Sequence, residues 1–425
     1  MRDVVVVGAG PAGLLAAIAA AERGADVLLL EKATKPGVKI LISGGTRCNV
    51  ANAADRRTTA ARFGHGEAFL RPSFRRYFRD DVFALLAREG VAVALEDART
   101  GKYFPASDRA LDVQRALVRR AASAGVELRL AAPVEGVDIA GEGFAVATAG
   151  DAIAARAVVL ALGGRSWPKV GTTGDGYRIA RALGHTVGET RPGLVPLRAR
   201  DAWVGALAGI VVPWAVASWS GGGRRVARAG DLLFTHVGLS GPGPMDLSSE
   251  LERAGAAEGA TVALDLVPRE SAEALRARLI AAAARDGARR AVRELEGDLP
   301  QRLLHAVFER ARVPHDRRLG DLTKPERAAL VAATKGLEVV LDGTLGFDKA
   351  EVTVGGVALD EVDAESMASK KVRGLYLAGE VLDLDGPIGG FNFQAAFSTG
   401  HLAGASAAEW VAKRGQEPFS PDRST

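Results

Sequence analysis

Three glycines and one acid near the start of the chain have the types and spacing of a dinucleotide-binding turn. Gly8, Gly10 and Gly13 follow an apolar run at 4–7, and Glu31 lies 21 residues after Gly10. In such a turn the first glycine permits the tight bend, the second lets a pyrophosphate approach the backbone, and the third lets a helix pack on the strand. An acid at this spacing reaches ribose hydroxyls, which favours FAD or NAD over NADP. The alternative is a glycine-bearing turn that binds nothing.

A second glycine-plus-acid pair lies near the end of the chain, where Gly379 and Glu380 close a small apolar strand. Four residues then open the last helix: Gly389, Gly390, Phe391 and Asn392. In large flavoproteins an acid at such a place bonds the ribityl chain, and the helix N-terminus stabilises negative charge on the reduced flavin ring. This pair therefore indicates FAD, and the alternative is an ordinary final βα unit that completes the sheet.

Several loops between these two pairs supply further candidate contacts to the cofactor. Polar side chains in a glycine-rich loop at 39–49 can donate to an anion or a ring carbonyl. An apolar strand at 157–162 ends on a double glycine, which lets backbone approach a ligand. The loop at 171–176 either shapes a helix cap or faces the ligand. With the first turn, these segments give the remaining predicted contacts: Pro11, Ala12, Lys32, Lys39, Ser43, Gly44, Arg47, Cys48, Asn49, Val134, Ala161, Leu162, Gly163, Gly164 and Asp175.

The sequence offers one candidate for a catalytic acid or base. His236 is considered because only histidine titrates near neutral pH without a perturbed environment, but it could equally bond a loop backbone. Cys48 is the single cysteine, and we expect it to act as a small apolar residue, with contact to the flavin as the alternative. One thiol excludes a dithiol–disulfide mechanism.

The order of strands and helices predicts the elements that position these residues. Strand, turn, helix and strand at 4–30, followed by further βα units, predict an α/β fold: a Rossmann-like FAD-binding domain of the two-dinucleotide-binding-domain flavoprotein type. From about 192 the chain favours strands and then Ala/Arg/Leu helices, which predicts an inserted α+β domain. The predicted boundaries are 1–191 and 346–412 for the FAD-binding domain, 192–345 for the inserted substrate or cap domain, and 413–425 for a flexible tail.

Composition limits the class of protein. The chain has 425 residues and a formal net charge of +4, with 48% hydrophobic and 25% charged residues, which is ordinary for a soluble globular protein of two or three domains. Its basic pairs are scattered at 56–57, 75–76, 119–120 and 224–225, so nucleic-acid binding is not expected.

The same totals bear on metals, membranes and location. A single cysteine and six histidines without paired ligand spacing predict no metal site. No apolar run near the start is long enough to span a bilayer, so no membrane contact is expected. The lone cysteine suits a reducing compartment, and no leader pattern precedes the first strand, so we expect a cytoplasmic location.

Taken together, these motifs resemble those of the BaiN/YhiN-type flavoproteins, a family of NAD(P)/FAD-dependent oxidoreductases that includes aminoacetone oxidase-like proteins. The resemblance covers nearly the whole chain and is carried by 8–13, 39–52, 101–105, 161–176, 234–242, 352–357 and 374–400. The chain departs from the family pattern at a few places: Thr46 for a third glycine, Ala51 for a threonine, Lys102 for an arginine, and Pro387 with Ile388 where a threonine is common. These departures indicate a divergent subgroup in which FAD binding should survive.

The resemblance implies a FAD-binding core made from both ends of the chain and covered by the central domain. It implies an oxidoreductase that transfers a hydride between flavin N5 and a small organic substrate, with NAD(P)H as a candidate transient electron donor. Family activities include reducing a conjugated double bond and oxidising an amine. The alternatives are a FAD-binding protein that modifies RNA and a non-catalytic, redox-sensing flavoprotein.

Overall fold

Two units make up the chain. The computed structural model describes residues 1–414; unit 1 contains Met1–Arg191 and the chain from Val352 onward, and unit 2 is Pro192–Glu351. The predicted end of the inserted part is 345, whereas residues 346–351 belong to unit 2. The Glu351 amide donates to the Leu194 carbonyl oxygen at 3.2 Å.

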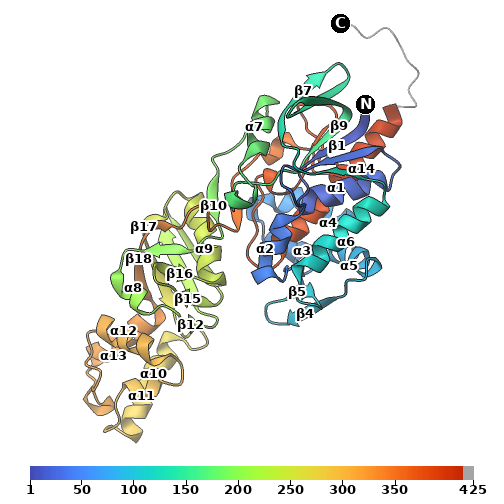
Figure 1. The fold of residues 1–425 in the computed structure, drawn as a ribbon. Coiled ribbons are helices and arrows are strands. Elements are labelled where there is room, and N and C mark those ends of the chain that lie inside the picture. Colours follow the sequence, from blue (N-terminus) through green and yellow to red (C-terminus); the bar gives the residue numbers. More distant parts are fainter. Residues whose placement is uncertain (415–425) are drawn as a thin grey trace. The chain divides into compact units, whose positions relative to one another are not determined.

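Unit 1 alternates strands and helices over both of its chain segments (Figure 1). Its strands are β1 (Arg2–Val7), β2 (Val27–Leu30), β3 (Ala51–Asn52), β4 (Val93–Asp97), β5 (Lys102–Pro105), β6 (Glu127–Arg129), β7 (Val134–Ala140), β8 (Gly143–Thr148), β9 (Asp151–Leu160), β19 (Val352–Val354) and β20 (Leu375–Leu377). Its α-helices are α1 (Pro11–Ala21), α2 (Val38–Thr46), α3 (Arg56–Ala61), α4 (Glu67–Arg76), α5 (Arg79–Arg88), α6 (Ala110–Ser123), α7 (Asp175–Ala182) and α14 (Phe391–Arg414). Short 3₁₀ turns lie at η1 (Gly64–Gly66), η2 (Pro168–Val170), η4 (Leu359–Glu361) and η5 (Gly379–Val381).

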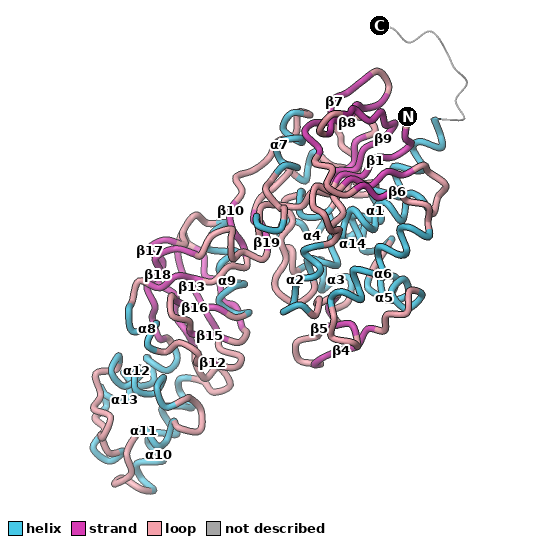
Figure 2. The backbone as a smooth tube through the Cα atoms, in the orientation of Figure 1, coloured by secondary structure: helices cyan, strands magenta, loops and turns pink. Residues whose placement is uncertain are grey.

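The largest sheet of unit 1 has seven strands, and the helices α1 and α14 lie beside it (Figure 2). Its order is β6-β2-β1-β9-β8-β7, and β20 also pairs with β9. The pairs β1–β2, β1–β9, β2–β6 and β9–β20 are parallel, whereas β7, β8 and β9 are antiparallel. The predicted Rossmann-like fold is thereby confirmed, with strands from both ends of the chain in one sheet.

Close packing of two helices holds the first and last segments of unit 1 together. A Cβ added at Gly400 would lie 2.2 Å from the Ala12 carbonyl oxygen, and one added at Gly404 would lie 2.0 Å from the Ala16 carbonyl oxygen. Residues four apart share one face of a helix, so a glycine pair on α14 meets an alanine pair on α1. Only glycine permits this backbone approach, and both helices also contact β1 and β9.

Unit 2 combines an eight-stranded sheet, ordered β12-β15-β16-β11-β18-β17-β13-β14, with helices. Its strands are β11 (Leu197–Ala199), β12 (Val211–Val212), β13 (Val216–Gly221), β14 (Arg224–Ala229), β15 (Leu232–Phe234), β16 (Gly238–Ser240), β17 (Glu258–Asp265) and β18 (Leu337–Thr344), and β10 (Arg191–Gly193) leads into it. Its helices are α8 (Ala202–Ala206), α9 (Pro242–Arg253), α10 (Ala272–Arg285), α11 (Val292–Leu295), α12 (Gln301–Arg310), the 3₁₀ turn η3 (Leu319–Asp321) and α13 (Lys324–Lys335). The pairs between its strands are antiparallel. Unit 2 is thus the α+β insertion in the sequence of unit 1.

Two local predictions differ from the structure. The segment predicted as a loop at 39–49 begins as helix α2, because Ile40 is fully buried and anchors the first turn. The predicted tail at 413–425 starts too early, since α14 continues to Arg414. The rest of that tail, 415–425, lies outside the described residues.

Candidate functional site

Four strands end in one row across the sheet of unit 1. In the register of the parallel pairs, Leu30, Val7, Leu160 and Leu377 lie side by side at the carboxyl ends of β2, β1, β9 and β20. Ligands of open α/β sheets bind in the crevice outside this edge. The candidate site is therefore built from the segments that directly follow this row.

The turn between β1 and α1 uses each of its glycines differently. Gly8 has a φ of +100°, and a Cβ there would lie 2.6 Å from the Ala161 carbonyl oxygen. A Cβ at Gly13 would lie 1.7 Å from the Gly8 carbonyl oxygen, so this position packs against the turn. Among the described residues, no atom lies within 4 Å of a Cβ added at Gly10. Two glycines are therefore required by the fold, while the third leaves open space in front of the helix.

The open space at Gly10 fits an anionic group. Gly10 is the N-cap of α1, no side chain caps that terminus, and the first turn contains no acidic residue. The first backbone N–H groups of a helix have no partner within the helix and carry its positive dipole end. Glu31, whose carboxylate accepts from the Ala9 and Ala33 amides at 2.8 Å each, lies beside the same turn. Because a carboxylate accepts more than two hydrogen bonds, Glu31 can also accept from a ribose hydroxyl.

Two other predicted contacts bind each other. Lys32 Nζ donates to Asp175 Oδ2 and to Thr173 Oγ1, both at 2.6 Å. Burial alone would raise the pKa of Asp175, but the hydrogen bonds from Lys32 and Thr173 and the charge of Lys32 lower it below its usual value. This ion pair ties the end of β2 to the start of α7 at the edge of the candidate site.

The second glycine-plus-acid pair meets α2 from the first half of the chain. Glu380 Oε2 accepts from Lys39 Nζ at 2.7 Å, while Glu380 Oε1 accepts from the Thr353 amide at 2.9 Å and from Ser166 Oγ at 3.1 Å. Lys39 Nζ also donates to Ser166 Oγ at 2.6 Å. A Cβ at Gly379, where φ is +74°, would lie 2.8 Å from the Ala12 Cβ. The predicted residues Lys39 and Glu380 are therefore brought together.

The start of α14 is fixed by amide side chains near β3. With its amide oriented to satisfy both ends, Asn49 accepts from the Gly390 amide at 3.0 Å and donates to the Ala51 carbonyl oxygen at 3.0 Å. Asn52 Nδ2 donates to the Gly389 carbonyl oxygen at 3.0 Å. A Cβ at Gly390, where φ is +88°, would lie 2.5 Å from the Ala51 carbonyl carbon. These contacts hold the Gly-Gly turn and the N-terminus of α14 in one place.

The turn after α2 contains a strained residue. Gly44, Gly45 and Thr46 have successive φ values of 54°, 66° and 69°. The left-handed region suits glycine but is rare for a β-branched residue such as Thr46. Thr46 is the position at which the family pattern has a third glycine, so this departure stores strain in the turn.

We expect Thr46→Gly to raise the free energy of unfolding by about 0.5–1 kcal/mol. Relief of the left-handed conformation gains about 1–2 kcal/mol per residue, and the greater freedom of glycine in the unfolded chain offsets about half of this. Urea unfolding of the wild type and the variant measures the difference. Thr46→Ala keeps the strain and serves as the control; an equal gain in that variant would show that strain at Thr46 is not the cause.

Three predicted contacts also bond other groups of the protein. Arg47 pairs with Glu96 at 2.6 Å and lies over the Phe104 ring, with its Cζ 4.1 Å from the ring centroid. Ser43 Oγ donates to the Ile40 carbonyl oxygen, and the Asn392 amide group bonds the Gly386 backbone in both directions, at 2.8–2.9 Å. These bonds fix the loops around the site, and contact of the three side chains with the cofactor stays a prediction.

Cys48 is fully buried, and burial raises the pKa of its thiol to about 12. Since the thiolate is the reactive form, we expect no reaction of native protein with Ellman's reagent at pH 8 and one thiol per chain after unfolding. Fast labelling of the native protein would contradict this and would restore a redox role for Cys48.

The remaining predicted residues divide between the two units. Around the row in unit 1 lie Pro11 and Ala12 at the start of α1, Ala161, Leu162, Gly163 and Gly164 after β9, Val134 at the start of β7, and Phe391 at the start of α14. His236 instead lies exposed in the turn between β15 and β16 of unit 2. A catalytic role for His236 stays a prediction.

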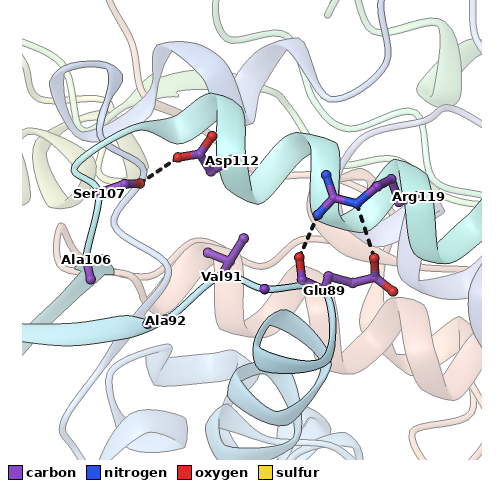
Figure 3. A pocket seen from close by; sticks show the side chains of 8 residues that line it. Glu89, Val91, Ala92, Ala106, Ser107, Asp112 and Arg119 are labelled. Atoms are coloured by element: carbon purple, nitrogen blue, oxygen red, sulfur yellow. Dashed lines mark hydrogen bonds and ion pairs between the residues drawn. The ribbon is translucent and has the colours of Figure 1, made fainter.

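A separate depression of about 430 Å³ lies between α5 and α6 (Figure 3). Its polar groups pair with each other, Arg119 with Glu89 at 3.3 Å and Ser107 with Asp112 at 2.7 Å. It contains none of the predicted cofactor residues. We therefore place the candidate site at the strand ends.

Sequence reasoning missed the residues that support this site. Ser166 and Thr353 bond Glu380, and Asn52 bonds the Gly-Gly turn. None of the three belongs to a local sequence motif that predicts such a role. Their only signal is that they lie within stretches shared with the family. Within residues 1–414, every helix is either too short or too polar to serve as a membrane span, and no group of three or more His, Cys, Asp or Glu side chains is placed to hold a metal ion.

Comparison with known proteins finds one protein family over nearly the full chain. The model of the family described as "HI0933-like protein Rossmann domain" matches residues 2–406. The chain is 30% identical to the 3-dehydro-bile acid delta(4,6)-reductase of Clostridium scindens over 96% of this chain and 100% of that protein. It is 33% identical to the ribosomal RNA dihydrouridine synthase of Escherichia coli (strain K12) over 93% of this chain and 96% of that protein.

Among solved structures, the 3-ketosteroid delta1-dehydrogenase of Sterolibacterium denitrificans is similar in fold, with a TM-score of 0.51 at 16% identity over 96% of this chain and 99% of that chain. At that identity the likeness concerns the fold alone. The family predicted from the motifs is confirmed by the two relatives, and with it the assignment as an FAD-dependent oxidoreductase. The chain belongs to the HI0933-like family of FAD-dependent Rossmann proteins.

Proposed function

We propose that this chain reduces a carbon–carbon double bond conjugated to a carbonyl group, with FAD as its resident cofactor. The observation that carries the proposal is the single row of strand ends, which brings a glycine turn and an acid from each end of the chain to one edge of a sheet. FAD bound there supplies hydride transfer, while the protein supplies orientation and a site shielded from water.

The two full-length relatives support this reaction class. One is named as a delta(4,6)-reductase of a 3-dehydro-bile acid, and the other as a synthase of dihydrouridine in ribosomal RNA. Each name describes saturation of a ring double bond that is conjugated to a carbonyl. The shared chemistry favours reduction over amine oxidation and over a non-catalytic redox sensor, although the two substrates differ greatly in size.

We assign the cofactor-binding roles by chemistry. The N-terminus of α1 at Gly10 would hold the pyrophosphate, because its N–H groups are uncapped and no side chain fills the space before them. Glu31 would accept from the ribose of the adenosine half. The backbone at 161–164 would line the same edge, since Ala161 already lies against Gly8.

The second half of the chain would hold the redox-active half of the cofactor. Glu380, fixed by Lys39, Ser166 and the Thr353 amide, is suited to accept from ribityl hydroxyls. The N-terminus of α14, positioned through Gly389 and Gly390, would stabilise negative charge on the reduced ring. NAD(P)H would act as a transient donor of electrons.

A second candidate substrate is a uracil base within RNA rather than a free small molecule. One specific observation favours it: the helical segment 272–335 of unit 2 contains 14 basic and 9 acidic residues, a formal charge of +5, whereas the whole chain carries only +4. The rest of the chain is therefore close to neutral. Concentrated positive charge is the electrostatic pattern of a nucleic-acid partner.

Anaerobic spectroscopy tests the proposed reaction. The purified protein should contain FAD, lose its visible flavin absorbance with NADH or NADPH, and regain it when a cyclic enone or a uridine-containing RNA is added without oxygen. Colour that returns only with oxygen would contradict the reduction of a conjugated bond. Loss of colour with a primary amine, but with neither nicotinamide, would reverse the direction to amine oxidation.

A further inference from the structure

The helices α10 to α13 of unit 2 bring together two arginine pairs that are far apart in the sequence. Arg290 and Arg318 form an antiparallel bridge, flanked by hydrogen bonds from the Ala291 amide to the Arg317 carbonyl oxygen and from the Leu319 amide to the Arg289 carbonyl oxygen, both 2.8 Å. These flanking bonds define a non-hydrogen-bonded pair, in which Cα atoms lie about 4.5 Å apart and side chains are closest. The arginines thus form a local cluster, although their sequence positions are scattered.

The four arginines at this bridge differ in whether a carboxylate neutralises their charge. Arg289 pairs with Glu294 at 3.6 Å, and Arg317 pairs with Glu326 at 2.7 Å. Arg290 and Arg318 are exposed, and among residues 1–414 neither has a carboxylate partner within 4 Å. The bridge is an isolated residue pair, and Ala291 after it already has helical backbone angles, so the two uncompensated charges are confined to Arg290 and Arg318.

Two uncompensated like charges directly opposite each other destabilise a β pair. The fold keeps this arrangement within the segment that holds the excess positive charge of the chain. Paired guanidinium groups suit phosphate oxygens, because each presents a planar fork of donors. The arrangement is therefore explained if an external phosphate group lies across Arg290 and Arg318.

We propose that this arginine bridge, Arg290 with Arg318, is part of an RNA-binding surface on α10 to α13 and contacts the phosphodiester backbone. The inference rests on the proposed function in one respect: RNA would be the carrier of the conjugated base that is reduced. The contacts are to phosphates, so they supply affinity and position rather than sequence recognition. RNA binding at this surface would be separate from FAD binding in unit 1.

RNA binding by the FAD-loaded protein tests the proposal. The probe is a fluorescein-labelled RNA hairpin with a uridine-rich single-stranded loop, measured by fluorescence anisotropy across a series of salt concentrations. The double variant Arg290→Ala/Arg318→Ala should bind about tenfold more weakly at low salt and lower the slope of log K against log salt by about 1.4, since each lost phosphate contact to a single strand removes about 0.7. The matched control Arg57→Ala/Arg115→Ala removes the same charge from exposed positions of unit 1 and should keep both values.

Stability provides an independent readout. The single variant Arg318→Ala should unfold at an equal or higher urea concentration than the wild type, because it removes a like-charge contact. The proposal would be overturned if the double variant kept the RNA affinity and the salt slope of the wild type. It would also be overturned if the unit 1 control lost as much RNA affinity as the double variant. The double variant should still reduce a small cyclic enone at the wild-type rate. If the wild-type protein also fails to reduce the cyclic enone, the result counts against the proposed function and not against the RNA-binding surface.

Discussion

The variant Gly10→Val is expected to fold normally and to be purified without colour. Gly10 has φ −77° and ψ −173°, which any residue can adopt, and a Cβ there meets no atom of the described chain, 1–414, within 4 Å. The valine side chain would instead fill the space in front of α1 where we place the pyrophosphate. FAD affinity should fall at least about 100-fold, equivalent to about 2.7 kcal/mol. Bound flavin per chain, measured by absorbance after gel filtration, checks the result, and circular dichroism checks the fold.

A matched control separates the local effect from the loss of any glycine. Gly297 in unit 2 also has open space around an added Cβ, so Gly297→Val should keep full flavin content. Gly13→Val would not be informative, because its Cβ would lie 1.7 Å from a carbonyl oxygen and would disrupt folding. A yellow Gly10→Val protein with wild-type flavin content would show that the pyrophosphate lies elsewhere.

The variant Gly404→Leu is expected to have the largest effect on stability, lowering the free energy of unfolding of unit 1 by about 3 kcal/mol. A Cβ at Gly404 would lie 2.0 Å from the Ala16 carbonyl oxygen, so α14 has to move away from α1. Overpacking of this kind costs about 1–3 kcal/mol, and here the obstacle is backbone that cannot change its rotamer. Thermal unfolding followed by circular dichroism measures the loss.

Leucine at an exposed position of α14 is the control. Glu409 is exposed, and within residues 1–414 its ion pair is a 3.7 Å contact with Arg23, so Glu409→Leu should stay close to the wild type. Equal stability of Gly404→Leu and the wild type would mean that the contact between α1 and α14 does not hold the two ends of the chain together.

The sequence predicts the first βαβ unit well because its determinants are local. Gly8, Gly10, Gly13 and Glu31 lie within one strand–turn–helix–strand segment, and their spacing alone specifies the turn. The second pair at Gly379 is recognised through the same chemistry. The sequence pattern also identifies the α+β insertion, because strand-favouring residues are followed there by helices rich in Ala, Arg and Leu.

The contacts that the sequence did not predict join distant segments. Lys39 and Glu380 are 341 positions apart, and only the fold brings them to 2.7 Å. The anchoring of Gly389 by Asn52 is equally non-local, with 337 positions between them. Arg47 lies in the predicted loop and also pairs with Glu96, a partner 49 positions away in the sequence. A polar residue in a ligand-facing loop is therefore a candidate whose partner the sequence does not specify.

The distribution of surface charge also depends on contacts between residues that are distant in the sequence. The basic pairs are scattered along the chain, which argued against a nucleic-acid partner. The antiparallel bridge between Arg290 and Arg318 joins residues that are 28 positions apart, and no periodicity in the sequence encodes this pairing. The net charge of +4 for the whole chain also does not reveal that the helical segment 272–335 alone carries +5.

The central claim is that both ends of the chain hold one FAD molecule. A crystal structure of the FAD-loaded protein tests it most directly. The account predicts a single FAD whose pyrophosphate lies at the N-terminus of α1 and whose ring lies at the Gly389–Gly390 turn before α14. A FAD that contacts only the first turn, or a nicotinamide nucleotide permanently bound in its place, would contradict the account.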